Sequence, residues 1–336
     1  EPTVTQNIHS IIKMISTLLE KKHAYEAENH ILFHVPSFKD YGNLSKRKKD
    51  EMIEGARIEV APYKKDPMDF VLWKPSTKDQ PGWDSPWGRG RPGWHIECSS
   101  IIKTYLGETI DIHLGGNDLI FPHHENEIAQ SNCAHDGKSL SKYWIHNGFI
   151  SMDKEKMSKS VGNIILVNDI LKNYTGEAIR LAMLTTHYKQ PLNWNENILI
   201  QANKNLENFY DVIGDKKNFE SIEPPKKFFD ALLNDLNTPE ALKELYELSK
   251  NKNTKDQLKS AANYLGILQL TKTEWINQRK KIKNLDQKKI EKLIDNRNKA
   301  RKEKNFVEAD KIRDKLTLDN IILEDSPSGT KWRINN

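Results

Sequence analysis

The stretch from residue 93 to residue 127 constrains the fold of this chain more than any other. It contains Cys98, His123 and Glu127, which together offer the ligand types that zinc accepts at tetrahedral sites. If the segment after Pro122 is helical, His123 and Glu127 stand one turn apart on the same face. Cys98 comes 25 residues before His123, so a shared metal ion requires the tertiary fold to bring the two segments together.

These three residues are one ligand fewer than the four that a tetrahedral zinc site has. The fourth is a water, a substrate atom or a group outside this chain, because Cys133 lies on a different part of the same expected helix. By spacing alone the three residues also suit ordinary core and surface positions, so both interpretations stay open. A zinc hydrolase of the HExxH type is excluded, because Ile128 stands where that motif needs its second histidine.

Length and composition indicate a polar protein of several domains. A chain of 336 residues suggests two to four domains, and 29% of its residues are charged. No apolar run approaches the roughly 18 residues of a membrane span. Two cysteines provide no disulfide framework, which favours a reducing, cytoplasmic location. The sequence opens at Glu1 without a signal-like segment, which leaves the true N-terminus an open question.

Positive charge is concentrated near the C-terminus. Residues 279–315 carry 15 Lys and Arg against 7 Asp and Glu, a net +8, whereas the whole chain is only +5. The remainder is therefore −3. A solvated helical face and a surface that contacts nucleic-acid phosphates explain this equally well.

Periodicity predicts a chain that begins with mixed elements and continues mostly as helices. We expect helices at residues 6–22, 48–55, 101–105, 168–174, 176–186, 197–212, 226–236, 288–303 and 306–318, with two more running through Leu248 and Tyr264. The expected strands are 31–35, 70–73, 109–113 and 143–150, and a hairpin of 321–324 with 330–334. Residues 80–92 are expected to be irregular. Thr238 is the expected N-cap of its helix, with Pro239 at the first helical position.

Three motifs, in matching order and spacing, carry a family resemblance. They are GWHIEC at 93–98, GNDLIFPHHENE at 116–127 and KMSKS at 156–160. Together they resemble the cysteinyl-tRNA synthetases, a family of class I aminoacyl-tRNA synthetases. The likeness continues through 65–74 and 237–241 to Trp332 and Arg333, so it covers nearly the whole chain.

The resemblance implies a fold and a set of domains. It implies an α/β Rossmann-type catalytic domain with an insertion, then an α-helical bundle and a small α+β anticodon-binding domain. The implied boundaries are 1–92 for the insertion, 93–142 for the second Rossmann half, 143–195 for a stem-contact region with the KMSKS loop, 196–285 for the bundle and 286–336 for the anticodon-binding domain. The family's HIGH motif and first zinc cysteine precede these segments, so we expect the first Rossmann half to be missing. HLGG at 113–116 is not that motif, because HIGH belongs near the start of the first half and is followed by a helix.

The resemblance also implies a reaction. L-cysteine would be joined to tRNA(Cys) through cysteinyl-adenylate, with ATP and Mg²⁺ as substrate and one Zn²⁺ per chain selecting the substrate thiolate. The protein would be a cytoplasmic monomer without a membrane partner. Carried over by position, the residue roles are catalysis for Lys156 and Lys159; ATP binding for Gly116, Asp118 and Lys159; the cysteine pocket for Trp94, His95 and His113; metal binding for Cys98, His123 and Glu127; and anticodon reading for Arg301, Asp310 and Asp325.

Several alternatives stay open at this stage. Within the family, a related ligase joins cysteine to an amino sugar but lacks the anticodon-reading tail, and a non-catalytic tRNA-binding paralogue would have lost the chemistry. At single residues, Trp94 also suits core packing, His113 a strand end and Asp118 a helix N-cap. His124 is expected to point away from the metal as a structural or supporting residue.

Overall fold

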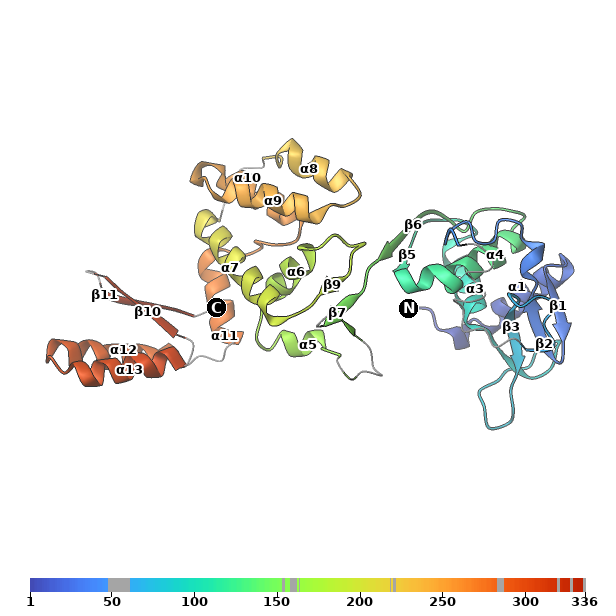
Figure 1. Ribbon diagram of the computed structural model, residues 1–336, viewed down its shortest axis with the longest axis horizontal. Helices are drawn as coiled ribbons and strands as arrows, with labels where there is room; N and C mark the ends of the chain where they lie inside the picture. Colours follow the sequence, from blue (N-terminus) through green and yellow to red (C-terminus); the bar gives the residue numbers. More distant parts are fainter. Residues whose placement is uncertain are drawn as a thin grey trace. The chain divides into compact units, whose positions relative to one another are not determined.

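The computed structural model describes residues 1–47, 61–152, 155–157, 162, 164–217, 219, 222–282, 287–318, 321–326 and 329–334. The chain divides into two compact units, Glu1–Gly148 and Phe149–Asn336 (Figure 1). The expected boundary between residues 142 and 143 falls inside a strand of the first unit. The expected helix at 48–55 and the second lysine of the KMSKS motif lie outside the described residues.

The first unit begins with a helix laid against a small antiparallel sheet. Helix α1 (Ile8–Glu20) follows the short turn η1 (Val4–Gln6) and buries one apolar face. The sheet has the order β1-β2-β3-β4, with strands β1 (Ala24–Ala27), β2 (His30–Phe33), β3 (Phe70–Pro75) and β4 (Gly90–Pro92), and the turn η2 (Val35–Ser37) follows β2. β2 and β3 were expected, but β1 and β4 were missed because short strands rich in polar residues, Gly and Pro carry little periodic signal.

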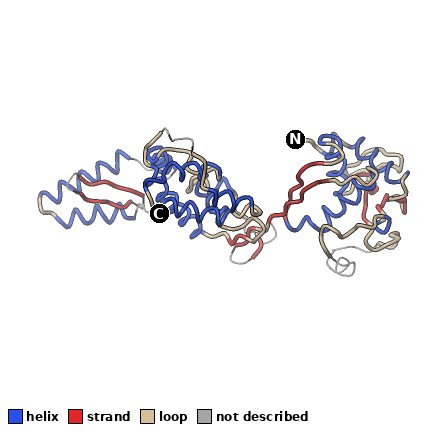
Figure 2. The backbone as a smooth tube through the Cα atoms, turned by 90° about the horizontal axis from the view of Figure 1, so that it is seen from above, coloured by secondary structure: helices blue, strands red, loops and turns tan. Residues whose placement is uncertain are grey.

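A parallel βαβ unit completes this half of the molecule. Helix α3 (Trp94–Leu106) leads to strand β5 (Ile110–Gly116), and the turns η3 (Asn117–Leu119) and η4 (Ile120–His124) lead to helix α4 (Glu125–Ala134) and strand β6 (Ser141–Asn147). β5 and β6 pair in parallel, with Ile112 opposite Tyr143, and run side by side in Figure 2. The strand expected at 143–150 is therefore two strands, because β7 belongs to the second unit.

One hydrophobic core joins the two parts of the first unit. It combines Ile11 and Ile15 of α1 and Leu72 of β3 with Ile96 of α3 and Ala129 of α4. Helix α1 packs against both α3 and α4. Residues 1–92 and 93–148 consequently share a single core.

The second unit opens with a small sheet followed by helices. The strands β7 (Ile150–Met152), β8 (Glu155–Lys156) and β9 (Leu192–Asn193) lie in the order β8-β7-β9. The helices are α5 (Val167–Ile170), α6 (Gly176–Leu184), α7 (Glu196–Ile213), α8 (Lys226–Leu233), α9 (Thr238–Ser249), α10 (Lys255–Tyr264) and α11 (Lys272–Ile282), with the turn η5 (Lys252–Thr254) before α10. α5 ends four residues earlier than expected, and α11 was missed because its face is mostly polar.

The predicted N-cap of helix α9 was wrong. Asn237, not Thr238, is the N-cap, and its side-chain oxygen accepts a hydrogen bond from the Glu240 amide at 3.2 Å. Thr238 is the first helical residue and donates its hydroxyl proton to the Leu184 carbonyl at 2.9 Å. Asn and Thr are both good caps, so the sequence alone did not separate them.

The C-terminal segment pairs two helices with a hairpin. Helices α12 (Gln287–Lys302) and α13 (Phe306–Leu318) lie side by side, and β10 (Ile321–Ser326) pairs antiparallel with β11 (Gly329–Ile334) (Figure 2). A small core of Ile290, Ile294, Ile312, Leu316 and Ile321 holds them together. These elements confirm the expected hairpin and both expected helices. Within the described residues no helix is long and apolar enough to cross a membrane.

Candidate active site

The start of helix α3 is fixed by its contact with strand β3. The Gly93 amide donates to the Leu72 carbonyl at 2.8 Å, and a Cβ atom on Gly93 would meet the Val71 carbonyl oxygen at 2.0 Å. Only glycine allows so close an approach of two backbones. The helix that begins here carries Trp94, His95 and Cys98 in its first two turns, so this contact sets their positions.

Cys98, His123 and Glu127 converge; the four-residue spacing predicted this for His123 and Glu127, and the fold brings Cys98 to them. His123 Nε2 lies 2.8 Å from Glu127 Oε1, one helical turn away. One ligand atom from each of the three residues lies within 4.8 Å of the other two. His123 and Glu127 are buried, and Cys98 is partly buried. The structure therefore brings together a thiol, an imidazole and a carboxylate at distances that one metal ion can bridge.

The Glu127 carboxylate is buried without a satisfying hydrogen bond. Only 1% of the residue is exposed, and its two oxygens approach His123 Nε2 at 2.8 Å and His113 Nε2 at 3.2 Å. Neither oxygen has a hydrogen-bond partner of proper geometry among the described residues. Burial alone would raise the pKa of Glu127, but the two imidazoles outweigh it and lower the pKa to about 2. A buried, ionised and unsatisfied carboxylate calls for a cation.

Three of the groups near this carboxylate, Cys98, His95 and His124, are neutral at pH 7. Burial, and after it the Glu127 charge, raises the pKa of the Cys98 thiol to about 12. Burial and the neighbouring His123 lower the pKa of His95 to about 4, and burial likewise lowers the pKa of His124 to about 4. Without a metal ion the site thus contains a protonated thiol beside an ionised carboxylate. Binding a cation would displace the thiol proton.

Histidines from four segments surround the three candidate ligands. His95 Nδ1 and His123 Nδ1 are 2.9 Å apart, so the His123 ring makes one hydrogen bond through Nδ1 and turns Nε2 toward Glu127. A metal-binding histidine commonly uses its second nitrogen in this way. His124 Nδ1 lies 2.8 Å from His146 Nε2, and His113, His124 and Glu127 form a second set of ligand atoms within 4.8 Å of one another. His124 therefore faces the site, contrary to expectation, and His146 was missed because it follows no motif.

The remaining pocket and ATP residues lie around this cluster. Trp94 is 59% exposed and places its ring centroid 4.2 Å from that of His123, so it is not core packing. The carboxylate of Asp118 lies where a Cβ atom on Gly116 would be, at 2.6 Å. Asp118 sits inside the turn η3, whose N-cap is Gly116, so Asp118 is not the cap. Gly116 ends strand β5, the strand end where ligands bind in open α/β sheets.

The two lysines of the KMSKS motif are described only in part. Lys156 belongs to strand β8, which pairs antiparallel with β7 through Ser151. Lys159 lies outside the described residues. Both belong to the second unit.

The three predicted anticodon residues gather around an arginine that the sequence did not single out. Arg297 donates from both terminal nitrogens to the two oxygens of Asp325, at 3.0 and 2.8 Å. Arg301 donates to the same carboxylate at 2.7 Å. Asp325, and to a smaller extent Asp310, raises the pKa of Arg297. Asp325 is thus already saturated by hydrogen bonds, whereas Asp310 makes an exposed ion pair with Arg313 at 3.3 Å.

Comparison with known families places this architecture in a class. Residues 1–204 match the model of the class I (C) tRNA synthetase catalytic domain, and residues 227–270 match the DALR domain. The first match spans the candidate metal ligands and the KMSKS motif, and the second spans helices α8 to α10. The chain therefore belongs to the class I aminoacyl-tRNA synthetases.

Curated relatives narrow the class to one family. The chain is 52% identical over 349 residues to the cysteine–tRNA ligase of Parvibaculum lavamentivorans, covering 99% of this chain and 74% of the relative. It is 47% identical to the cysteine–tRNA ligases of Maricaulis maris and Pelagibacter ubique, with 99% of this chain and 75% and 74% of those proteins covered. The chain belongs to the cysteine–tRNA ligase family.

Proposed function

We propose that this chain takes part in the ATP-dependent ligation of L-cysteine to tRNA(Cys) through cysteinyl-adenylate, and that zinc binds the substrate thiolate. The observation that carries the zinc step is the buried Glu127 carboxylate, ionised and unsatisfied, beside Cys98 and His123. Family membership supports the charging reaction, since the curated relatives are cysteine–tRNA ligases.

The donor set fits zinc better than magnesium or calcium. A thiol and an imidazole are poor ligands for hard cations, whereas zinc accepts sulfur, nitrogen and oxygen together. In this proposal Cys98 Sγ, His123 Nε2 and one oxygen of Glu127 hold the ion, and a bound zinc would stabilise the substrate sulfur as a thiolate. His95 holds the His123 ring through the contact between the two Nδ1 atoms. His113 lies within hydrogen-bonding distance of the second carboxylate oxygen.

This arrangement accounts for the choice of cysteine over serine. A pocket that senses only size or a small apolar difference discriminates by roughly 10- to 200-fold. A thiolate is a much stronger zinc ligand than a serine hydroxyl, so a zinc ion held by these residues would provide greater selectivity for the substrate sulfur. Trp94, exposed beside His123, is placed to cover the substrate side chain.

We assign residues of each unit separately to the adenylation step. The α-phosphate of ATP is attacked by the cysteine carboxylate, and pyrophosphate leaves. We assign Gly116 and Asp118 to the adenosine, since glycine allows close approach and a carboxylate accepts from sugar hydroxyls. We assign Lys156 and Lys159 to phosphate charge, with Mg²⁺ accompanying the nucleotide, because phosphoryl chemistry depends on positioning and cationic stabilisation.

The C-terminal segment is assigned to the tRNA. Residues 279–315 have a net charge of +8, which suits contact with phosphates. Within this segment Arg301 is partly exposed and Asp310 is exposed on helices α12 and α13. We propose that Arg301 and Asp310 contact anticodon bases and that Asp325 orients Arg301, since its own oxygens are occupied.

The two cysteines of the chain provide a matched test of the metal assignment. Cys98→Ser removes a proposed ligand, whereas Cys133→Ser changes the other cysteine, which is buried but belongs to neither ligand set. We expect Cys98→Ser to lose most of its zinc, measured by atomic spectroscopy, and to lose cysteine-dependent ATP–pyrophosphate exchange.

The control variant is expected to keep both properties. Circular dichroism and thermal melting of the two variants would show whether either substitution has unfolded the protein. Full zinc occupancy in folded Cys98→Ser would contradict the ligand assignment.

A further inference from the structure

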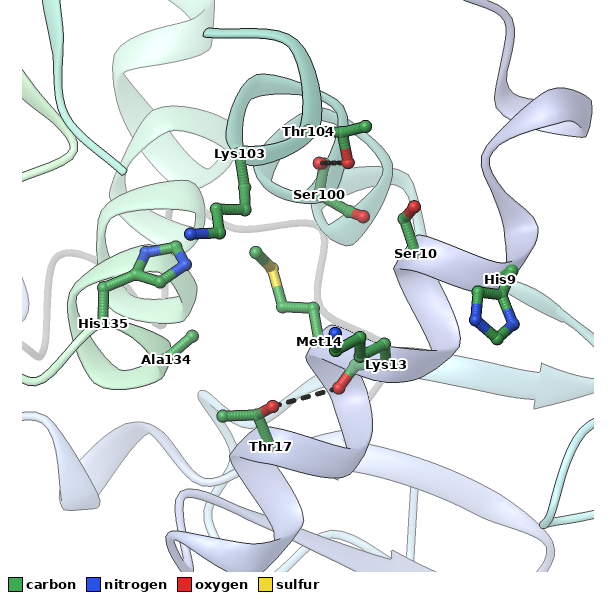
Figure 3. Close-up of a pocket in the computed structure, with 10 residues that line it drawn as sticks. All are labelled: His9, Ser10, Lys13, Met14, Thr17, Ser100, Lys103, Thr104, Ala134 and His135. Atoms are coloured by element: carbon green, nitrogen blue, oxygen red, sulfur yellow. Dashed lines mark hydrogen bonds between the residues drawn. The ribbon is translucent and has the colours of Figure 1, made fainter. Parts of the chain in front are cut away.

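A cavity lies on helices that also carry the candidate metal ligands, but at a different place along them. It is enclosed by α1, α3 and the end of α4, with a volume of about 350 Å³ (Figure 3). This is within the size range of small-molecule sites. The residues that line it are His9, Ser10, Lys13, Met14, Thr17, Ser100, Lys103, Thr104, Ala134 and His135.

The polar lining is rich in cationic groups and hydroxyls. Lys13 and Lys103 supply ammonium groups, and four Ser and Thr residues contribute hydroxyls. No carboxylate is among the described residues that line the cavity. Lys103 binds Glu108 outside it at 2.6 Å, but Lys13 makes no ion pair within the described part of the chain. The lining therefore has a net positive charge that nothing inside the cavity balances.

One buried nitrogen of the wall and one hydroxyl make no hydrogen bond with the described residues. Ser100 is only 1% exposed, and its side-chain hydroxyl has no hydrogen-bond partner in the described part of the chain, although its carbonyl accepts from Thr104 at 2.8 Å. His135 Nδ1 is also buried without a hydrogen bond. Burial, followed by the Lys103 charge, lowers the pKa of His135, so the ring is neutral at pH 7 and one of its nitrogens can donate. Buried polar groups without partners are uncommon in folded proteins.

We propose that this cavity binds the phosphate group of a small phosphate monoester. Lys13 supplies the balancing charge, and the Ser10 and Ser100 hydroxyls supply donors to the phosphate oxygens, which accept several hydrogen bonds at once. The Thr17 and Thr104 hydroxyls already donate to backbone carbonyls. Met14, which extends from α1 into the cavity in Figure 3, offers an apolar surface to the body of the ligand. A divalent cation is the wrong ligand, since it would need carboxylates.

The site is separate from the proposed metal centre. None of its lining residues belongs to either set of candidate metal ligands. Ser100 and Cys98 are nevertheless only two residues apart on α3. Binding here can therefore be measured without changing a metal ligand, and zinc content serves as an independent check that α3 is intact.

Methyl NMR of the full chain tests the proposal at the cavity itself. The chain has six methionines, and with ¹³C-methyl labelling the Met14 resonance is assigned by Met14→Leu. The probes are inorganic phosphate and ribose 5-phosphate, a monoester without a base that could enter an adenosine site. We expect the Met14 resonance to shift saturably with both probes, and ribose 5-phosphate to bind more tightly because its sugar contacts the wall.

Variants of the lining make the assignment specific. We expect Lys13→Gln to weaken ribose 5-phosphate binding about tenfold and Ser100→Ala to weaken it by a smaller factor. Lys22→Gln, which removes a lysine just beyond α1 that does not line the cavity, is the matched control and should change nothing. A Met14 resonance that does not shift with either probe, or binding that survives Lys13→Gln unchanged, would overturn the proposal and leave the cavity to water.

Discussion

Two carboxylates in this molecule, Glu127 and Asp325, carry the same charge but differ in their exposure to solvent and in their hydrogen bonds. Both have a lowered pKa. Glu127 is 1% exposed, and neither of its oxygens has a hydrogen-bond partner of proper geometry in the described residues. The Asp325 side chain is 39% exposed and accepts from Arg297, Arg301 and Thr330. The first carboxylate needs something the protein does not supply, and the second has all its partners within the chain.

This difference separates a binding site from a structural cluster. An unsatisfied buried charge costs several kcal/mol unless a ligand balances it, so Glu127 marks a place built for a cation. A carboxylate held by two arginines and a hydroxyl organises its neighbours instead. From sequence motifs alone, both residues were predicted to contact a ligand directly.

Three expected effects test this comparison, and the largest is a loss of metal affinity when His113, which lies next to Glu127, is substituted. His113→Phe keeps a ring in place and removes the nitrogen 3.2 Å from Oε2. Supporting residues of this kind typically contribute about 10- to 100-fold to metal affinity, so we expect a loss in that range in chelator competition. His146→Phe is the control, since His146 contacts His124 and not Glu127. Equal loss in both variants would mean that the histidine cluster acts only through packing.

A smaller effect on zinc affinity is expected for each unit of change in pH. The pKa of the Cys98 thiol is about 12 without metal, so a proton must leave when zinc binds. Zinc affinity should therefore rise about tenfold per pH unit between about pH 6 and 8. Competition titrations at three pH values measure the slope, and Cys98→Ser should flatten it. A flat profile in the unmodified chain would exclude Cys98 as a ligand.

The smallest expected effect is the loss of stability of the C-terminal segment when Asp325 is substituted. Asp325→Asn should destabilise the C-terminal helices and hairpin by only about 1 kcal/mol, since the cluster is partly exposed to solvent. The arginines hold the pKa of Asp325 below its ordinary value, so its contribution is present above about pH 4 and is lost as the pH falls further. Urea unfolding at two pH values measures this, with exposed Asp314→Asn as the control.

The same variant also tests the role of Asp325 in tRNA recognition. We expect weaker charging of tRNA(Cys), because Arg301 loses its anchor, while ATP–pyrophosphate exchange is unchanged. Charging that is unaffected by Asp325→Asn would contradict the orienting role. Loss of exchange would instead indicate a wider folding defect.

Local patterns were readable from the sequence, and contacts between distant segments were not. The four-residue spacing of His123 and Glu127 predicted their shared face, and the helix that starts at Phe306 was placed to the residue. The approach of His113 from β5 to Glu127 depends on the pairing of β5 and β6, which no short motif encodes. The hydrogen bonds from Arg297 to Asp325 join residues 28 positions apart. One arginine within a basic run is not distinguished from its neighbours by any sequence pattern.

The shared core of the first unit bears on how this enzyme can be modified. Ile11 and Ile15 of α1 pack in the same cluster as Ile96 of α3 and Ala129 of α4, so the amino-terminal region is part of the scaffold that holds the cysteine, histidine and glutamate in register. Excising it as a dispensable module would leave the helices α3 and α4 without their packing partners. Minimised or chimeric versions of this synthetase should therefore exchange residues 1–148 as one block.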